Sequence, residues 1–490
     1  MVQGTSSGVG KSLVVAALCR LFARRGWSVA PFKAQNMSLN SGVTPDGYEI
    51  GRAQIVQAIA SNRPPDVLMN PILLKPEGDT KSQLVVMGRP LGSFSAGEYY
   101  DNKLNLWEVV RGAIAELSRM VELVIIEGAG SPVEINLMDR DIVNMRVAKL
   151  VDAPVLLVGD IERGGVFASI YGTVALLNED AKYVKGVIIN KFRGDTDILS
   201  PGIRALENMI GIPVLGVIPY LRHSIDDEDS ISDRFSRFRD RDSTRDVRIG
   251  VVKLAFMSNY TDILPLEEDV DVIYFDPDNP PLGLDAVIIP GSKNTIQDLQ
   301  ILKDAGFYEW LVSFRSSGGR VVGICGGYQM LGEYVSNPYG VETAVDGIRG
   351  FGLLGVETVL EKQKSVYLVR AFAEGGVSVS GYEIHMGRTV LKRDVVPFLR
   401  IVERNGKRVD VRDGALSSDR RVWGTYVHGI FDSGSFRRYF INLIRAEKGL
   451  KLLEKEPCSW IQRLDKELDR FSDVVERNVD IEKIVEILSF

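Results

Sequence analysis

The sequence predicts an α/β protein built from two doubly wound domains and a helical C-terminal tail. The first observation is a series of short Val- and Ile-rich runs, including residues 123–126, 154–158 and 186–189, that alternate with helical stretches. Continuous apolar runs of this length are typical of parallel strands buried on both faces of a sheet. The second observation is that the alternation stops at a densely charged segment and starts again at residue 247.

Composition divides the chain into four parts. Residues 1–225 form the first α/β domain, and residues 247–435 form the second. Residues 226–246 are so rich in charge that they cannot bury a core, which predicts a charged linker. Residues 436–490 lack strand-like runs and carry spaced apolar side chains, which predicts a helical tail packed on the second domain.

The overall composition is that of a globular enzyme. The 490 residues are 45% hydrophobic and 25% charged, and a chain of this length is expected to form more than one core. The formal net charge of −6 argues against a general nucleic-acid surface. No uninterrupted apolar run reaches the ~18 residues of a membrane-spanning helix, and three widely spaced cysteines do not make a disulfide framework. We therefore expect a cytoplasmic protein that binds neither nucleic acid nor a membrane.

A glycine-rich loop opens the first domain. Residues 4–12 read GTSSGVGKS, and an apolar helical stretch follows them. Such a loop presents backbone N–H groups to phosphate oxygens, while its lysine adds charge and its serine hydroxyl can reach Mg²⁺. The glycine spacing is one residue longer than the standard loop and matches the variant of the dethiobiotin-synthetase-like ATPases. The predicted phosphate-binding residues are Gly4, Thr5, Gly8, Gly10, Lys11 and Ser12.

Polar side chains follow two further predicted strands of the first domain. Lys33 comes shortly after a strand-like segment at residues 28–30, and Glu127 comes directly after the run at 123–126. Open α/β sheets bind ligands at the carboxyl ends of their strands. A carboxylate there can hold Mg²⁺ beside phosphates, so Ser12 and Glu127 are the predicted metal ligands. Because so few residues precede Gly4, we expect the strand that feeds the loop to be short or to begin upstream of Met1.

The second domain carries a candidate nucleophile. At Cys325 an apolar run breaks into Cys-Gly-Gly and resumes as a helical pattern. A sharp strand-to-helix turn holds a thiol clear of the sheet, and the helix N-terminus favours the thiolate. His428, one of only three histidines, is the candidate general base. The N–H of Gly326 is the expected first oxyanion donor, and the turn at Gly291 is the expected second.

These segments identify the chain as similar to the cobyric acid synthase family, the glutamine-dependent amidotransferases of corrinoid synthesis. The resemblance covers nearly the whole chain, because matching segments occur in order in both halves. They are residues 33–41, 49–54, 69–76, 127–132, 159–167, 190–195, 290–295 and 381–389, with the segments around Cys325 and His428.

The resemblance implies a two-part reaction. ATP and Mg²⁺ would activate the b, d, e and g carboxylates of a corrinoid a,c-diamide, and glutamine hydrolysed at Cys325 would supply ammonia. Lys33 would stabilise charge on the transferred phosphoryl group, and Asn190 would lie near the adenine. No tightly bound organic cofactor is expected. Polar residues that could contact the corrinoid are Gln35, Asn36, Asn40, Arg52 and Gln54.

One position departs from the pattern of the class I glutaminases. They carry a glutamate two residues after the catalytic histidine, where this chain has Ile430. The group that orients His428 is therefore expected to come from elsewhere or to be absent. His385 is a second candidate base, but the related glutaminases place their base late in the domain, which favours His428.

Three other functions compete with this interpretation. The sister amidotransferase that makes the a,c-diamide shares the two-domain design, and a peptidoglycan-precursor amidase is a more distant enzyme of the same kind. A partitioning-type ATPase switch would explain the phosphate loop alone. That last alternative leaves Cys325 and His428 without a function.

Overall fold

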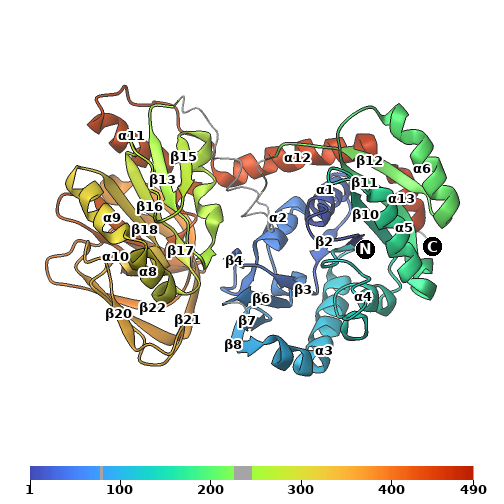
Figure 1. Cartoon of the computed structure of the whole chain (residues 1–490), viewed down its shortest axis with the longest axis horizontal. Helices are drawn as coiled ribbons and strands as arrows, with labels where there is room; N and C mark the ends of the chain where they lie inside the picture. Colours follow the sequence, from blue (N-terminus) through green and yellow to red (C-terminus); the bar gives the residue numbers. More distant parts are fainter. Residues whose placement is uncertain (78–80, 224, 226–244, 489–490) are drawn as a thin grey trace.

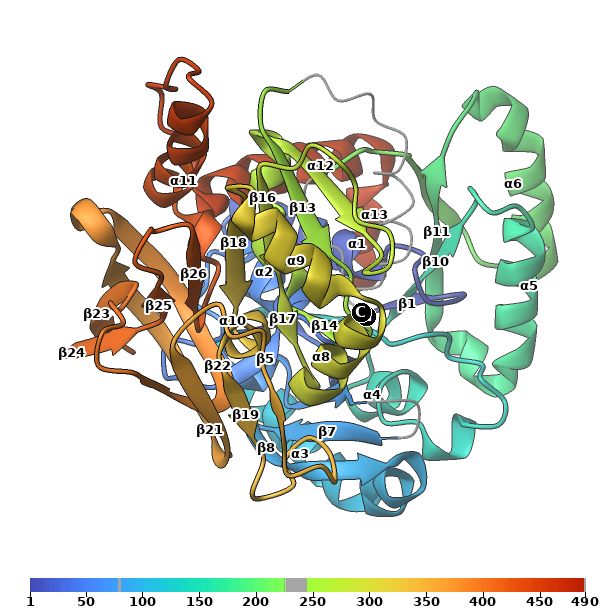
Figure 2. The same cartoon turned by 60° about the vertical axis from the view of Figure 1, so that its left-hand side comes forward.

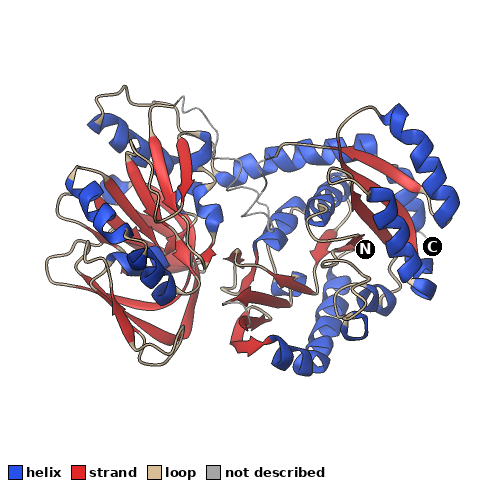
Figure 3. Ribbon diagram, viewed as in Figure 1, coloured by secondary structure: helices blue, strands red, loops and turns tan. Residues whose placement is uncertain are grey.

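The computed structural model describes residues 1–77, 81–223, 225 and 245–488. Two α/β domains lie side by side, with helices flanking sheets in both of them (Figures 1 and 3). The predicted linker at 226–246 lies outside the described residues except for residues 245 and 246.

The first domain is built on a parallel sheet whose loops carry the candidate nucleotide site. Its four central strands pair in the order β1, β10, β11, β12, and a bridge from Val2 to Glu127 joins a further parallel pair, β2 and β9. These strands are β1 (Val2–Gly4), β2 (Val29–Phe32), β9 (Leu123–Ile126), β10 (Val155–Asp160), β11 (Val184–Phe192) and β12 (Val214–Pro219). The apolar runs predicted to be strands are therefore β9, β10 and part of β11, and β1 is the short strand that feeds the loop.

Helices cover both faces of this sheet, as a doubly wound fold requires. They are α1 (Lys11–Arg24), α2 (Arg52–Ala60), α3 (Ala96–Met120), α4 (Met145–Leu150), α5 (Val166–Leu176) and α6 (Thr196–Ile210). Because successive strand side chains point to opposite faces, Val155 and Leu157 of β10 pack with α5 and α6, whereas Leu156 and Val158 pack with α1.

The first domain also contains strands that the sequence did not predict. A short hairpin and a small mixed sheet lie between β2 and α3 in the chain. The hairpin strands are β4 (Ser41–Val43) and β5 (Glu49–Gly51), and the sheet contains β3 (Gln35–Met37), β6 (Ile72–Pro76), β7 (Lys81–Val86) and β8 (Arg89–Ser95).

The second domain is built on a parallel sheet that positions the candidate nucleophile. Its strand order is β15, β13, β16, β18, β26, and β25 joins the edge in antiparallel orientation. The strands are β13 (Arg248–Val252), β15 (Asp271–Phe275), β16 (Ala286–Ile289), β18 (Arg320–Ile324), β25 (Ala415–Leu416) and β26 (Val422–Thr425). The flanking helices are α8 (Thr295–Asp304), α9 (Phe307–Ser316), α10 (Gly326–Leu331) and α11 (Gly434–Glu447).

A second, largely antiparallel sheet lies beside this parallel sheet, and Figure 2 shows its long strands β21 and β22. Its strands are β19 (Tyr334–Ser336), β20 (Gly347–Arg349), β21 (Val356–Phe372), β22 (Ser378–Leu391), β23 (Leu399–Arg404), β24 (Lys407–Asp413) and β27 (Val427–His428). The sequence predicted only the doubly wound part, because most of β21 mixes apolar with charged and polar residues, and its one apolar run, residues 366–369, is mostly only partly buried. The strand β27 pairs with β22 and carries the candidate base.

The predicted helical tail is divided between the two domains. Phe436 and Phe440 of α11 belong to the core of the second domain. In contrast, α12 (Trp460–Asn478) crosses to the first domain and α13 (Ile481–Leu488) follows it there (Figure 1). Leu464 and Leu468 of α12 pack into the apolar cluster that contains α1. The prediction that the tail packs on the second domain is therefore correct for α11 and wrong for α12 and α13, since an amphipathic pattern does not specify which surface covers it.

Replacing Leu468 with alanine is expected to destabilise the first domain by about 2–5 kcal/mol, the usual cost of a buried Leu→Ala cavity. The Leu468 side chain is fully buried between α12 and the first domain. Thermal unfolding followed by circular dichroism measures the effect, and Ile461→Ala on the same helix is the control because Ile461 is 43% exposed. Equal unfolding curves for the two variants would contradict the docking of α12.

Candidate active sites

The predicted phosphate loop connects β1 to α1 at the carboxyl edge of the first sheet. Gly8 and Gly10 have φ angles of 72° and 95°, a region that glycine adopts without strain. A Cβ atom on Gly10 would also lie 2.3 Å from Nδ2 of Asn190. The Lys11 side chain folds back over the loop, and its Nζ donates to the Ser6 carbonyl at 2.9 Å. The loop thus has the conformation and the lysine placement needed to surround a phosphate group.

Glu127 is the centre of a buried polar cluster beside this loop. Its Oε1 accepts a hydrogen bond from Ser12 Oγ at 2.7 Å and pairs with Lys33 Nζ at 2.9 Å. Its Oε2 accepts from Gln57 Nε2 at 2.6 Å. Burial favours the neutral carboxyl, but Lys33 and the hydrogen bonds from Gln57 and Ser12 hold the pKa of Glu127 below its usual value. The structure therefore brings Ser12, Lys33 and Glu127 together as predicted, and adds Gln57.

The oxygen atoms of this cluster fit Mg²⁺. Mg²⁺ in nucleotide sites takes one or two protein oxygen ligands and completes its coordination with phosphates and water. Ser12 Oγ and the Glu127 carboxylate, 2.7 Å apart beside the loop, are such a pair. Among the described residues no cluster of three or more His, Cys, Asp or Glu could hold a metal ion by itself. The ion would therefore be held jointly with a nucleotide.

The strand β11 supplies two more residues to the phosphate loop. Asn190 is buried, and its Nδ2 donates to the Val9 carbonyl at 2.8 Å. Lys191, which the sequence did not single out, donates to the Gly8 carbonyl at 2.7 Å and pairs with Asp160 at 2.9 Å. Asn190 thus supports the loop, and its contact with adenine stays a prediction.

The five candidate corrinoid residues lie on or near the hairpin of β4 and β5, but most are buried among protein atoms. Asn36 donates to Gln54 at 3.0 Å, and both side chains are buried. Asn40 is buried as well, whereas Gln35 is partly exposed. Arg52 lies 4.1 Å from the ring of Trp460 and 3.7 Å from Asp432 Oδ2 of the second domain. Arg52 therefore has contacts at the domain boundary, and all five corrinoid contacts stay predictions.

The candidate nucleophile Cys325 occupies the predicted strand-to-helix turn, between β18 and α10. Its φ of 51° and ψ of −105° are unusual for a residue with a side chain and mark a strained turn. The Cys325 N–H donates to the Thr425 carbonyl at 2.8 Å, which fixes the turn to β26. A Cβ atom on Gly327 would lie 2.0 Å from the Ile289 carbonyl oxygen, so the helix can approach β16 only because this residue is glycine.

The candidate base His428 is oriented by a carboxylate that the sequence did not reveal. The His428 Nδ1 atom lies 2.7 Å from Oδ2 of Asp262, and Oδ1 of the same carboxylate accepts from the Gly429 N–H at 2.7 Å. Asp262 lies on the short 3₁₀ helix η4 (Tyr260–Ile263) of the second domain, and it is 2% exposed. The sequence left two possibilities, that the orienting group comes from elsewhere in the chain or that it is absent. The first is correct and the second is wrong. Its position far upstream of His428 gave no local sequence signal.

The surroundings of His428 favour the protonated ring. Burial lowers the pKa of His428, but the Asp262 carboxylate and the neighbouring Cys325 raise it, with the net result that the pKa is raised to about 10. Hydrogen bonds with Asp262 and Cys325 both contribute to this shift. A protonated imidazole beside a sulfur atom stabilises negative charge on the sulfur. Cys325, His428 and Asp262 thus have the arrangement of a nucleophile, a base and an orienting acid.

The two predicted oxyanion donors lie on turns that contact each other beside this triad. Gly326 is the first residue of α10, and a Cβ on it would lie 2.8 Å from the Ser292 nitrogen. Gly291 begins the two-residue strand β17 (Gly291–Ser292), which pairs with β14 (Met257–Ser258). A Cβ on Gly291 would lie 3.1 Å from Cε1 of His428. Both glycines are therefore beside the catalytic groups, and their N–H donation to an oxyanion stays a prediction.

The alternative base, His385, has a different environment. Its ring stacks on Tyr426 at 3.8 Å between centroids, and its Nδ1 lies 2.8 Å from the Gly387 carbonyl. Its other nitrogen lies 3.7 Å from Glu383. His385 thus also has a carboxylate neighbour, but its ring nitrogens face Gly387 and Glu383, whereas His428 is hydrogen-bonded to Cys325 as well as to Asp262. The geometry therefore favours His428 as the base.

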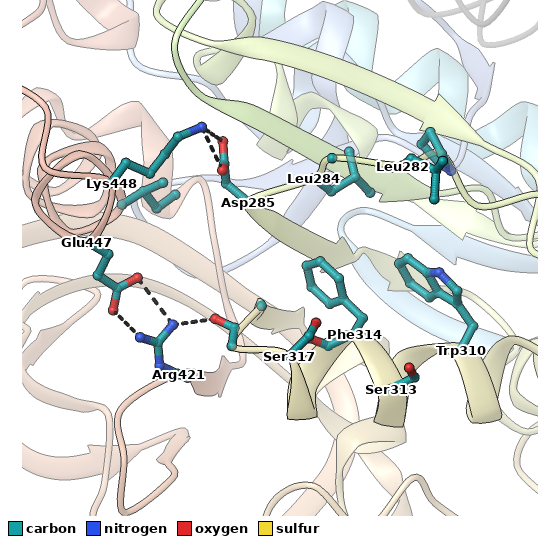
Figure 4. A pocket seen from close by; sticks show the side chains of 15 residues that line it. Leu282, Leu284, Asp285, Trp310, Ser313, Phe314, Ser317, Arg421, Glu447 and Lys448 are labelled. Atoms are coloured by element: carbon teal, nitrogen blue, oxygen red, sulfur yellow. Dashed lines mark hydrogen bonds and ion pairs between the residues drawn. The ribbon is translucent and has the colours of Figure 1, made fainter.

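A hollow of about 580 Å³ lies at the opposite end of the second-domain strands (Figure 4). Its walls include Leu284, Trp310 and Phe314, and its charged residues are paired with one another, as in Lys448 with Asp285. It adjoins the amino ends of β16, β18 and β26, whereas Cys325 follows the carboxyl end of β18. The hollow is therefore separate from the catalytic groups.

In the part of the chain that the structure describes, none of the helices combines the length and the apolar character needed to cross a membrane.

Comparison with known proteins assigns both halves of the chain to sequence families. Residues 1–230 match the CobQ/CobB/MinD/ParA nucleotide binding domain, and residues 248–436 match the CobB/CobQ-like glutamine amidotransferase domain. The whole chain is 48% identical to cobyric acid synthase of Caldanaerobacter subterraneus subsp. tengcongensis, over 98% of that protein. It is 47% identical to cobyric acid synthase of Clostridium botulinum strain Loch Maree, over 99% of that protein. Cobyric acid synthase of Streptococcus sanguinis is 47% identical over 98% of its length.

Proposed function

Because the chain belongs to the cobyric acid synthase family, we propose that it uses ATP and glutamine to amidate the b, d, e and g carboxylates of (adenosyl)cobyrinic acid a,c-diamide. It is thus a glutamine-dependent carboxylate amidoligase of cobalamin biosynthesis. The observation that carries this proposal is the presence of two sites in one chain. A Cys325–His428–Asp262 triad can release ammonia, and a phosphate loop with Glu127 can activate a carboxylate.

The triad would hydrolyse glutamine through a thioester. The Cys325 sulfur attacks the carboxamide carbon, and the N–H groups of Gly326 and Gly291 receive the oxyanion. His428 gives its proton to the departing ammonia and then withdraws one from the water that hydrolyses the thioester. Asp262 holds the ring in the required orientation throughout and keeps the proton on Nδ1 once the other nitrogen has given up its own.

The first domain would activate the corrinoid carboxylate. The loop N–H groups and Lys11 bind the phosphates of ATP, and Ser12 and Glu127 hold Mg²⁺, which neutralises phosphate charge when bound. Lys33, which neutralises Glu127 in this structure, would also face the transferred phosphoryl group. Phosphoryl transfer to the carboxylate gives an acyl phosphate, and ammonia then displaces phosphate to leave the amide.

Replacing Glu127 with glutamine is expected to slow amidation on the order of 10²- to 10³-fold, the usual effect of removing one preorganised charge from a polar transition state. Because the loss lies in carboxylate activation, ammonium chloride in place of glutamine should not restore it. Corrinoid product formed per minute is the measurement. Glu122→Gln is the control, since Glu122 is an exposed acid at the start of the same strand. Equal rates for the two variants would show that Glu127 takes no part in carboxylate activation.

The proposed function is tested by incubating the protein with ATP, Mg²⁺, glutamine and the corrinoid a,c-diamide. Each amidation exchanges a hydroxyl for an amino group, so mass spectrometry counts the amides formed. Four new amides are the expected product. Amidation of cobyrinic acid, with none of the a,c-diamide, would instead identify the sister enzyme that makes the a,c-diamide.

A further inference from the structure

The hairpin of β4 and β5 in the first domain docks directly on the glutaminase site. Val43 of β4 packs with Tyr382 and Ile384 of β22 in one apolar cluster. The Tyr382 ring in turn stacks on the His428 ring, with 5.4 Å between centroids. At the other hairpin strand, the fully buried Glu49 pairs with Lys364 of the second domain. The hairpin is therefore fixed against the domain that holds the triad.

Asn259 of the second domain holds the chain at the start of this hairpin from both sides. Its Oδ1 accepts a hydrogen bond from the Ser41 N–H at 3.1 Å. Its own N–H donates to the Leu39 carbonyl at 3.4 Å. These two contacts flank Asn40, one of the candidate corrinoid residues. Asn259 is 2% exposed, so both bonds are shielded from water.

The same residue begins the turn that carries the orienting acid. Asn259 has a φ of 49° and a ψ of 42°, a left-handed conformation that asparagine tolerates better than most residues. Its carbonyl accepts the N–H of Asp262 at 3.0 Å, which closes the first turn of η4. Asp262 then contacts His428 and Gly429. One short turn thus connects the first-domain segment at residues 39–41 to the catalytic histidine.

We infer that Asn259 is a positioning residue for the glutaminase triad. It links the position of the segment at residues 39–41 to the position of Asp262, and through Asp262 to the orientation of His428. The inference rests on the proposed function, because Asn40 in that segment is one of the predicted corrinoid contacts. Acceptor binding in the first domain then sets the orientation of His428 in the second. Glutamine is hydrolysed fastest when an acceptor is in place, and ammonia is released when it can be used.

The test is Asn259→Gly in the full chain, because glycine keeps the left-handed backbone and removes the buried side chain that accepts the Ser41 N–H. We expect kcat for glutamine hydrolysis in the presence of corrinoid and ATP to fall about 10-fold, with KM for glutamine unchanged. Stimulation by corrinoid and ATP should shrink, and amidation with ammonium chloride should stay at the wild-type rate. Asn259→Asp keeps an acceptor for the Ser41 N–H and should retain most of the activity.

The matched control is Glu77→Gln, because Glu77 pairs with Lys293 across the same domain boundary at 2.8 Å without contacting the turn of Asp262. Wild-type kcat and wild-type stimulation in Asn259→Gly would overturn the inference. So would an equal loss in Glu77→Gln, or a parallel loss of ammonium-dependent amidation, because either would indicate general weakening of the interface. A wild-type chain that hydrolyses glutamine but amidates no corrinoid would count against the proposed function alone, since the variants can still be compared by glutamine hydrolysis.

Discussion

Replacing Cys325 with serine is expected to abolish glutamine-dependent amidation while leaving ammonium-dependent amidation intact. Loss of a nucleophile that works with a positioned base typically lowers kcat on the order of 10⁶-fold. A serine hydroxyl is far less acidic than a thiol, so the neighbouring His428 cannot turn it into a comparable nucleophile. The phosphate-loop site uses no group of the triad, so added ammonia should bypass the defect. Glutamate release and corrinoid mass, measured in parallel, check both halves.

Cys458→Ser is the control for this experiment, because Cys458 is an exposed cysteine in the segment before α12. It should keep both activities. Glutamine hydrolysis near the wild-type rate in Cys325→Ser would rule out the amidotransferase mechanism with Cys325 as its nucleophile. Loss of the ammonium-dependent reaction as well would show that the variant perturbs the whole chain.

The parts of the fold that could be predicted from sequence are those with strong local signals. The strands β9 and β10 are continuous apolar runs because both faces of a parallel sheet are covered by helices. The sheet of β21 and β22 gave a weaker signal, because its long strands mix charged and polar residues with apolar ones and many of their side chains are only partly buried. The apolar face of α12 predicted a helix, but its partner in the first domain depends on long-range contacts that the pattern does not encode.

The candidate sites divide in the same way. The phosphate loop and the Cys325 turn are local structures, in which glycines and the reactive residue lie within a few positions of each other. Asp262 is 166 residues away from His428 in the sequence, and it replaces a glutamate expected two residues after the histidine. The pairing of β27 with β22, the fold of η4 and its contacts with η7 (Ile430–Asp432) bring the acid and the ring together. A search for polar residues near the carboxyl ends of the second-domain strands would have included Asp262, since η4 comes soon after β13.

Replacing Asp262 with asparagine is expected to lower kcat for glutamine hydrolysis about 10⁴-fold, as the equivalent change does in serine proteases. The asparagine oxygen can still accept from Gly429, which turns the amide NH₂ toward Nδ1 of His428. The ring must then accept at Nδ1 and carry its proton on the other nitrogen, the wrong tautomer for a base. Ammonium-dependent amidation should be unaffected. Asp269→Asn is the control, because Asp269 pairs with Arg437 in the same domain and lies outside the triad.

The pH dependence of stability gives a second test of the Asp262 assignment. The folded-state pKa of His428 is raised to about 10, above the value of about 6.5 expected in the unfolded chain. A group with a raised folded-state pKa contributes stability that is complete below about pH 6.5 and is lost as the pH rises through about 10. Because Asp262 supplies the main attraction, Asp262→Asn should lower this pKa, and the stability advantage of the wild type should shrink across that pH range. Thermal unfolding of both proteins between pH 6 and pH 10 measures it. A constant difference across the range, with glutaminase activity near wild type, would show that Asp262 does not control the charge on His428.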